Sequence, residues 1–102
     1  MKTTVVRYKL KSGRADENIA YIRKVFEQLQ RESPDGLRYC SFQLEDGLSF
    51  LHIAQFDDAL EANPLAAVSA FKTFISNIAE RCEEPPRPVS ASLIGAYKTF
   101  GA

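Results

Sequence analysis

The chain has 102 residues, 45% of them hydrophobic and 25% charged, which is the size and composition of one globular domain spanning residues 1–102. Thirteen basic residues balance thirteen acidic ones, and no apolar run approaches the roughly 20 residues of a membrane span. The sequence therefore predicts neither a nucleic acid nor a membrane as a partner. The N-terminus shows no signal-peptide pattern and the two cysteines fit no metal spacing, so we expect a cytoplasmic protein with reduced thiols.

The first third of the chain predicts a strand followed by a helix. Residues 3–11 alternate in polarity, which is typical of a strand with Arg7 on one face and an apolar set on the other: Val6, Tyr8 and Leu10. From Arg14 to Glu32 apolar residues recur at steps of three and four, which predicts an amphipathic helix. Its expected buried stripe consists of Ile19, Ile22, Phe26 and Leu29.

Residues 37–56 predict a β-hairpin centred on Asp46-Gly47, because this dipeptide favours a two-residue type I′ turn. The resulting register places Ser41 opposite His52. One face is then purely apolar, and we expect helices to cover it: Cys40, Phe42, Leu51 and Ile53. The other face holds the only histidine and mixes aromatic with polar side chains: Tyr39, Ser41, Gln43, Phe50, His52 and Phe56. Such a face suits the wall of a ligand cavity or a subunit interface.

The second half predicts a helix and a last strand. Asn63-Pro64 favours a helix start, with Asn as N-cap, and this helix is expected to run to about Cys82. Residues 83–88 are expected to form an extended linker and residues 89–100 the last strand, long enough to reach a partner's sheet.

The order β-α-β-β-α-β predicts an α+β, ferredoxin-like fold, with a four-stranded antiparallel sheet and the helices on one face. The uncovered face is then the aromatic and polar one, and exposing it to water is costly. We therefore expect it to pack against a second copy, giving a homodimer that encloses a cavity.

This element order resembles the antibiotic-biosynthesis monooxygenase-like family of the dimeric α+β barrel superfamily. The resemblance covers nearly the whole chain, and its local motifs are residues 50–56, the acidic turn at residues 57–62 and the tail at residues 81–97. It implies a small cofactor-independent monooxygenase, an oxidoreductase acting on an aromatic or quinol-like molecule. The family's oxygenases place a Trp at the end of the third strand and an Asn four residues earlier, where this chain has Phe56 and His52.

The heme-degrading branch of the family implies an axial His near the start of the second helix. This chain has Asn63-Pro64-Leu65-Ala66 there, so we expect no heme and no other cofactor. The acidic residues Asp57, Asp58 and Glu61 lack the convergent spacing of a metal site, so no metal is expected either.

His52 is the main candidate for chemistry. It can act as a general base that deprotonates a phenol or quinol for reaction with O₂, or it can be a strand histidine bonded to Ser41 with only an interface role. Tyr39 can hold a substrate oxygen or fill the dimer seam. Arg7 can neutralise an anionic intermediate if it faces the cavity, and a strand bulge would bring Tyr8 there instead. The expected substrate-binding residues are Phe50, Phe56, Ser41, Gln43 and Tyr8.

Whether the domain is an enzyme stays open at this point. The alternative is a non-catalytic homodimer of the same fold that holds a small ligand or none, and a third hypothesis is an isomerase or decarboxylase. An open cavity that reaches His52 favours an enzyme, whereas a cavity filled by Phe50, Phe56 and Tyr39 favours a structural dimer.

Overall fold

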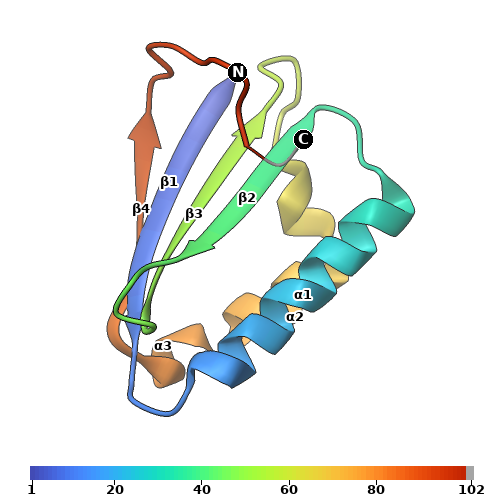
Figure 1. Cartoon of the computed structure of the whole chain (residues 1–102). Coiled ribbons are helices and arrows are strands. Elements are labelled where there is room, and N and C mark those ends of the chain that lie inside the picture. Colours follow the sequence, from blue (N-terminus) through green and yellow to red (C-terminus); the bar gives the residue numbers. More distant parts are fainter. Residues whose placement is uncertain (101–102) are drawn as a thin grey trace.

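The fold consists of a four-stranded antiparallel sheet with helices packed on one face (Figure 1). A computed structural model describes residues 1–100. The strands are β1 (Lys2–Leu10), β2 (Leu37–Gln43), β3 (Ser49–Phe56) and β4 (Cys82–Ala91), in the spatial order β2-β3-β1-β4. The helices are α1 (Ala15–Glu32), the 3₁₀ helix η1 (Pro64–Ala67), α2 (Ser69–Ser76) and α3 (Ile78–Arg81). This confirms the ferredoxin-like arrangement expected from the sequence.

The hairpin has the predicted register but a different turn. Leu37 lies opposite Phe56, and Ser41 lies opposite His52. Within residues 44–49 only Gly47 has a positive φ, of 74°, whereas a type I′ turn needs two such residues. The Gly47 N–H donates to the carbonyl of Leu44 at 3.0 Å, and one oxygen of Asp46 accepts from two backbone N–H groups, those of Leu48 and Ser49. The side chain of Asp46 thus holds a longer loop in the same register.

The helices cover the aromatic and polar face of the sheet, and the prediction that they cover the apolar face is wrong. Phe50 and His52 of β3 are buried beneath the helices, at 2% and 4% exposure, whereas Leu51 and Ile53 stay half-buried on the other side. Burying the mixed face is tolerated because its polar groups find hydrogen-bond partners and its rings pack, with Tyr8 stacked on Phe50 at 5.6 Å. We call the side away from the helices the open face. Its apolar residues are Val5, Cys40, Phe42, Leu51 and Ile53, and the ring of Phe100 packs against Phe42 at 5.1 Å.

Helix α1 begins one residue after the predicted start, and its buried side is rotated from the predicted stripe. The buried residues are Asn18, Val25 and Gln28, while Ile19, Ile22 and Leu29 are half-buried. Gln28 links the helices, because its side-chain oxygen accepts from the Ala70 N–H at 2.8 Å. This bond satisfies one of the free N–H groups at the start of α2.

The second helical segment is divided into three pieces where one continuous helix was predicted. The oxygen of the Asn63 side chain accepts from the Leu65 N–H at 3.0 Å, which is the expected N-cap, but this cap starts the 3₁₀ helix η1. Val68 then adopts an extended backbone conformation and buries its side chain before α2 begins. Asn77 separates α2 from α3.

Strand β4 starts earlier than predicted, and residues 92–100 contain no helix or strand. The predicted linker, residues 83–88, is part of β4, and the last strand expected at residues 89–100 ends at Ala91. Its three prolines are tolerated because β4 is an edge strand, which pairs only with β1 and needs only half of its N–H groups. The β1–β4 pairing is irregular between Arg7 and Lys9, but this bulge leaves Tyr8 facing the helices.

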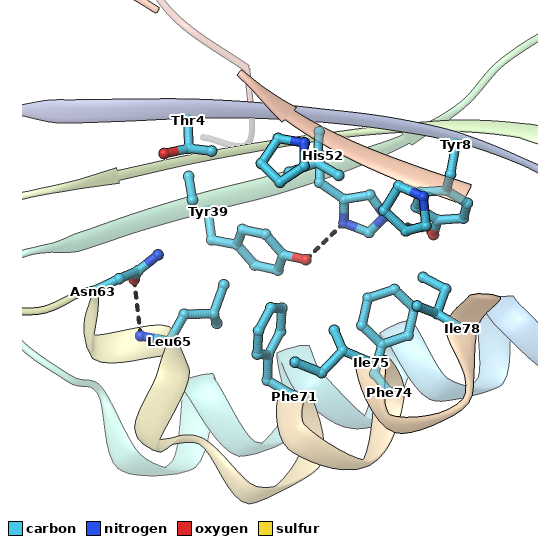
Figure 2. A pocket seen from close by; sticks show the side chains of 14 residues that line it. Thr4, Tyr8, Tyr39, His52, Asn63, Leu65, Phe71, Phe74, Ile75 and Ile78 are labelled. Atoms are coloured by element: carbon cyan, nitrogen blue, oxygen red, sulfur yellow. Dashed lines mark hydrogen bonds between the residues drawn. The ribbon is translucent and has the colours of Figure 1, made fainter. Parts of the chain in front are cut away.

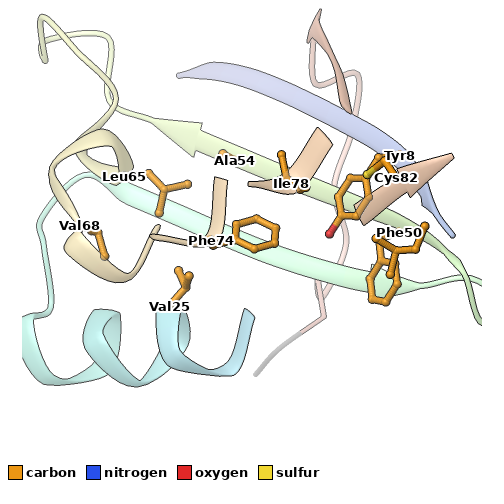
Figure 3. Close-up of a cluster of buried hydrophobic side chains, with 10 residues drawn as sticks. Tyr8, Val25, Phe50, Ala54, Leu65, Val68, Phe74, Ile78 and Cys82 are labelled. Atoms are coloured by element: carbon orange, nitrogen blue, oxygen red, sulfur yellow. The ribbon is translucent and has the colours of Figure 1, made fainter. Parts of the chain in front are cut away.

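The hydrophobic core lies between the sheet and the helices (Figure 3). Its buried members come from both layers: Tyr8, Leu10, Val25, Phe50, Ala54, Leu65, Val68, Phe74, Ile78 and Cys82. Within residues 1–100 no helix combines the length and the apolar character that crossing a membrane requires.

Candidate functional site

A pocket of about 200 Å³ lies between the sheet and the helices (Figure 2). Strands β1, β2 and β3 form one wall, η1, α2 and α3 form the facing wall, and two prolines of β4 lie at the edge. The lining residues are Thr4, Val6, Tyr8, Tyr39, His52, Ala54, Asn63, Leu65, Phe71, Phe74, Ile75, Ile78, Pro86 and Pro88. None of them is Lys, Arg, Asp or Glu, and most of the wall is apolar; its polar side chains are those near His52 and those of Thr4 and Asn63.

His52 is the centre of a hydrogen-bonded cluster in this wall. Its Nδ1 lies 2.6 Å from the Tyr39 hydroxyl and 2.8 Å from the Ser41 hydroxyl. Its Nε2 lies 2.8 Å from the Tyr8 hydroxyl. The ring also packs against aromatic rings on three sides, those of Tyr8, Tyr39 and Phe74, with centroid distances of 5.3, 5.8 and 5.5 Å. The imidazole is therefore held in one orientation by both layers of the fold.

Burial keeps the members of this cluster uncharged. It lowers the pKa of His52 to about 4, so the imidazole is neutral at physiological pH. Burial also raises the pKa of Tyr39 to about 12, and it raises the pKa of Tyr8 well above its usual value. The site thus presents neutral hydroxyl and imidazole groups to the pocket.

Two residues that the sequence analysis did not select complete the cluster. The Asn18 side-chain nitrogen donates to the Tyr8 hydroxyl at 2.8 Å, and Nη2 of Arg81 donates to the Asn18 oxygen at 3.2 Å. Asn18 stands four residues before Ile22 in the helical stripe, and a polar residue at an apolar stripe position is a signal that could have identified it. For Arg81 the sequence carries no comparable signal.

All predicted site residues except Arg7 lie on the helix-covered face of the sheet, but only some of them line the pocket. His52, Tyr39 and Tyr8 line the pocket. Ser41 does not line it, but its hydroxyl lies within hydrogen-bond distance of His52. Phe50 is buried against Tyr8 but does not line the pocket, and the exposed Gln43 donates to the carbonyl of Gly47 at 3.0 Å. Phe56 lies outside the pocket, where the Lys2 ammonium sits 5.5 Å from its ring centre.

Arg7 is exposed and lies opposite Leu51, on the open face of the sheet. It is separated by the sheet from the pocket, so the sequence-based interpretation that placed it beside His52 is wrong. Strand β1 is oriented as predicted, with Tyr8 toward the helices and Arg7 on the other face; the error is that His52 and the pocket lie on the face that the helices cover. Among residues 1–100 no group of three His, Cys, Asp or Glu side chains converges on a metal position.

Comparison with solved structures finds the same fold in several proteins, some of them named as monooxygenases. No protein-family model and no curated protein matches the sequence. A candidate antibiotic biosynthesis monooxygenase from Nitrosomonas europaea has a TM-score of 0.77 at 21% identity, covering 93% of this chain and 100% of that one. This chain has the fold of the antibiotic biosynthesis monooxygenases.

Two further structures support the same fold. A second candidate monooxygenase, from Bacteroides thetaiotaomicron, has a TM-score of 0.74 at 15% identity over 98% of this chain and 95% of that one. A variant of SnoaB, a cofactor-independent oxygenase from Streptomyces nogalater, has a TM-score of 0.69 at 14% identity over 96% of this chain and 97% of that one. These likenesses confirm the fold that the sequence resemblance implied, over almost the full length of each chain.

Proposed function

We propose that this protein is a small cofactor-independent oxygenase that acts on an aromatic or quinol-like molecule bound between the sheet and the helices. The observation that carries this proposal is a mainly apolar pocket whose wall includes the buried, hydrogen-bonded cluster around His52. The fold shared with SnoaB, a cofactor-independent oxygenase by name, supports the reaction class. The pocket reaches His52 and is not filled by Phe50 or Phe56, which favours an enzyme over a purely structural dimer.

The pocket limits the substrate by size and charge. A volume of about 200 Å³ lies below the 300–1,000 Å³ typical of sites for drug-sized ligands, so a molecule of one or two rings fits. Phe71 and Phe74 offer aromatic faces for such rings. Because none of the lining residues is Lys, Arg, Asp or Glu, the site favours a substrate without a carboxylate or ammonium group.

Tyr39 is the group that we assign to the substrate oxygen. The general-base role considered for His52 needs a ring nitrogen with a free lone pair, but both nitrogens lie within 2.8 Å of a hydroxyl. The Tyr39 hydroxyl lines the pocket and can donate to the oxygen of a phenol as that phenol loses its proton to solvent. His52 then holds Tyr39 in place.

The anion formed in this way is electron-rich enough to react with O₂. In the proposed net reaction the phenol loses its O–H hydrogen and one ring C–H hydrogen and becomes a quinone with two C=O groups. One oxygen atom of O₂ enters the ring, and the other leaves as water with the two hydrogens. The substrate supplies all four electrons, so the reaction needs no external reductant.

Oxygen consumption with small hydroxynaphthalenes tests this function. We expect Tyr39→Phe to lower kcat/KM by roughly 10²-fold, the usual loss when one donor to a developing oxyanion is removed. The matched control is Tyr97→Phe, because Tyr97 is 83% exposed in the tail and should leave the rate unchanged. Saturable binding without oxygen uptake would instead support the non-catalytic ligand-binding alternative.

We also propose that two copies associate through the open face as a homodimer. The apolar residues of the open face are only half-buried in the single chain, although Phe100 packs against Phe42 there, and helices cover the opposite side of the sheet. The interface therefore lies on the side opposite to the one first expected, and the pocket lies within one chain. A cytoplasmic location stays a prediction.

A further inference from the structure

A buried chain of hydrogen bonds connects Arg81 to the pocket. Nη2 of Arg81 donates to the Asn18 oxygen, the Asn18 nitrogen donates to the Tyr8 hydroxyl, and that hydroxyl lies 2.8 Å from Nε2 of His52. Arg81, Asn18 and Tyr8 are each at most 2% exposed. Bulk water therefore offers these groups no alternative partners, and the bonds between them decide where the protons lie.

The chain has a direction because a guanidinium group carries only donors. Arg81 fixes the oxygen end of the Asn18 amide as the acceptor, so the nitrogen end must donate to Tyr8. The Tyr8 oxygen then accepts from Asn18, and its single proton is left for Nε2 of His52. A neutral imidazole that accepts at Nε2 carries its own proton at Nδ1.

We infer that Arg81 and Asn18 are positioning residues that place the proton of His52 on Nδ1 and thereby make Tyr39 a hydrogen-bond donor to a ligand in the pocket. A protonated Nδ1 cannot accept from Tyr39 or Ser41, which lie 2.6 and 2.8 Å away. Tyr39 lines the pocket whereas Ser41 does not, so the Tyr39 proton is directed toward the ligand. The pocket therefore selects an acceptor oxygen, as in a carbonyl or a phenolate.

The surroundings of Arg81 favour this role over simple stabilisation. Among residues 1–100 no carboxylate forms an ion pair with its guanidinium. The group lies over the Tyr21 ring at 4.7 Å and near the Phe74 ring at 5.7 Å, and its remaining nitrogens Nε and Nη1 have no hydrogen-bond partner in the described chain. Its other bond is to the carbonyl of Phe74, at 2.9 Å. A buried cation without a carboxylate opposes folding, so stability alone does not explain it.

The tautomer of His52 can be measured directly, since it is the only histidine in the chain. Two-bond ¹H–¹⁵N correlation spectra of the ¹⁵N-labelled protein at neutral pH should show a protonated Nδ1 and an unprotonated Nε2. A protonated Nε2 in the wild-type protein would overturn the inference, and this measurement needs no variant and no substrate.

Asn18→Asp should reverse the chain with almost no change in shape. A carboxylate has only acceptors, so Tyr8 would donate to it and Nε2 of His52 would have to carry the proton to donate to Tyr8. We expect the spectrum to change to the Nε2–H form. Asn77→Asp, the same change at an exposed position between α2 and α3, should leave the Nδ1–H form in place. An Nδ1–H form in a folded Asn18→Asp variant would contradict the inference.

Binding of a matched pair of probes tests the ligand class. Acetophenone and α-methylstyrene differ only in a C=O and a C=CH₂ group, and we expect the wild-type protein to bind acetophenone roughly fivefold more tightly. The preference should disappear in Asn18→Asp, because Tyr39 then donates to Nδ1. Equal affinities in the wild type would contradict the inference. This binding test rests on the proposed function only because it uses the same pocket. If neither probe binds, the result counts against the proposed function. The NMR measurement of the His52 tautomer would still decide the inference.

Discussion

At the scale of single residues, the site is built around a histidine that the fold keeps uncharged. His52 is buried to 4% exposure, and every hydrogen-bond partner of its ring is a hydroxyl group. No carboxylate therefore favours the imidazolium form, and burial alone lowers its pKa to about 4. The imidazole is therefore neutral at pH 7, and protonating it in acid would place an uncompensated charge inside the protein.

The stability of the protein should fall in mild acid because of this one residue. The unfolded chain takes up a proton on His52 near pH 6.5, whereas the folded protein does so only near pH 4. Between these values the unfolded state binds more protons, so the free energy of unfolding decreases as the pH falls and is unaffected above about pH 7. From pH 7 to pH 5 we expect a loss of about 2 kcal/mol, measured by urea denaturation.

His52→Gln is the control for this pH dependence. The variant lacks the titrating group, and most carboxylates stay ionised above pH 5, so its free energy of unfolding should be nearly flat between pH 7 and pH 5. An equally steep decrease in the variant would assign the effect to other groups.

At the scale of the elements, much of the fold follows from local patterns. The element order, the bounds of α1 to within one residue and the hairpin register were predictable, because period-two and period-3.6 patterns and turn residues are local. The face of the sheet that the helices cover was not predictable, because an alternating pattern defines two faces without showing which one is buried. That choice depends on partners from distant elements, such as Asn18 of α1 and Arg81 of α3.

The candidate site was predictable to the same degree. His52, Tyr39 and Tyr8 were identified from their residue types, and they do lie together. Arg7 was wrongly assigned to the site because the pocket was expected on the face away from the helices. Asn18 and Arg81 were missed because their roles arise from contacts across 10 and 63 residues of sequence. The early start of β4 was missed because prolines argue against a strand unless its edge position is known.

The hairpin loop offers a test of one backbone conformation. Gly47→Ala places a Cβ on a residue with a φ of 74°, and no atom lies within 4 Å of that position. The effect should therefore come from the backbone alone, a loss of about 1 kcal/mol in the free energy of unfolding. Gly95→Ala, also with free space but without a positive φ, should change stability by less than about 0.5 kcal/mol. Equal effects of the two substitutions would show that the loop conformation is not the cause.

At the scale of the whole molecule, the proposed homodimer uses the open face and leaves the pocket within each chain. Ile53 lies near the middle of that face, between Val5 of β1 and Cys40 of β2. We expect Ile53→Asp to convert a dimer into a monomer by light scattering, because an unpaired charge in the interface is strongly unfavourable.

Two controls distinguish loss of the dimer from loss of the fold. Glu27→Lys changes an exposed charge on α1 and should leave the dimer intact. Phe50→Asp, which the predicted faces would have made an interface variant, places a charge in the core beneath the helices and should unfold the protein. A dimeric Ile53→Asp variant would show that the open face is not the interface.

The clustering of tyrosines around the pocket gives the protein an intrinsic optical signal. The chain has four tyrosines and no tryptophan to mask their emission. Tyr8 and Tyr39 bond to His52, and Tyr21 lies under the guanidinium of Arg81. Only Tyr97 stands apart, exposed in the tail. With Tyr97 changed to Phe, the remaining tyrosine emission comes only from Tyr8, Tyr21 and Tyr39, so occupancy of the pocket can be followed without a label.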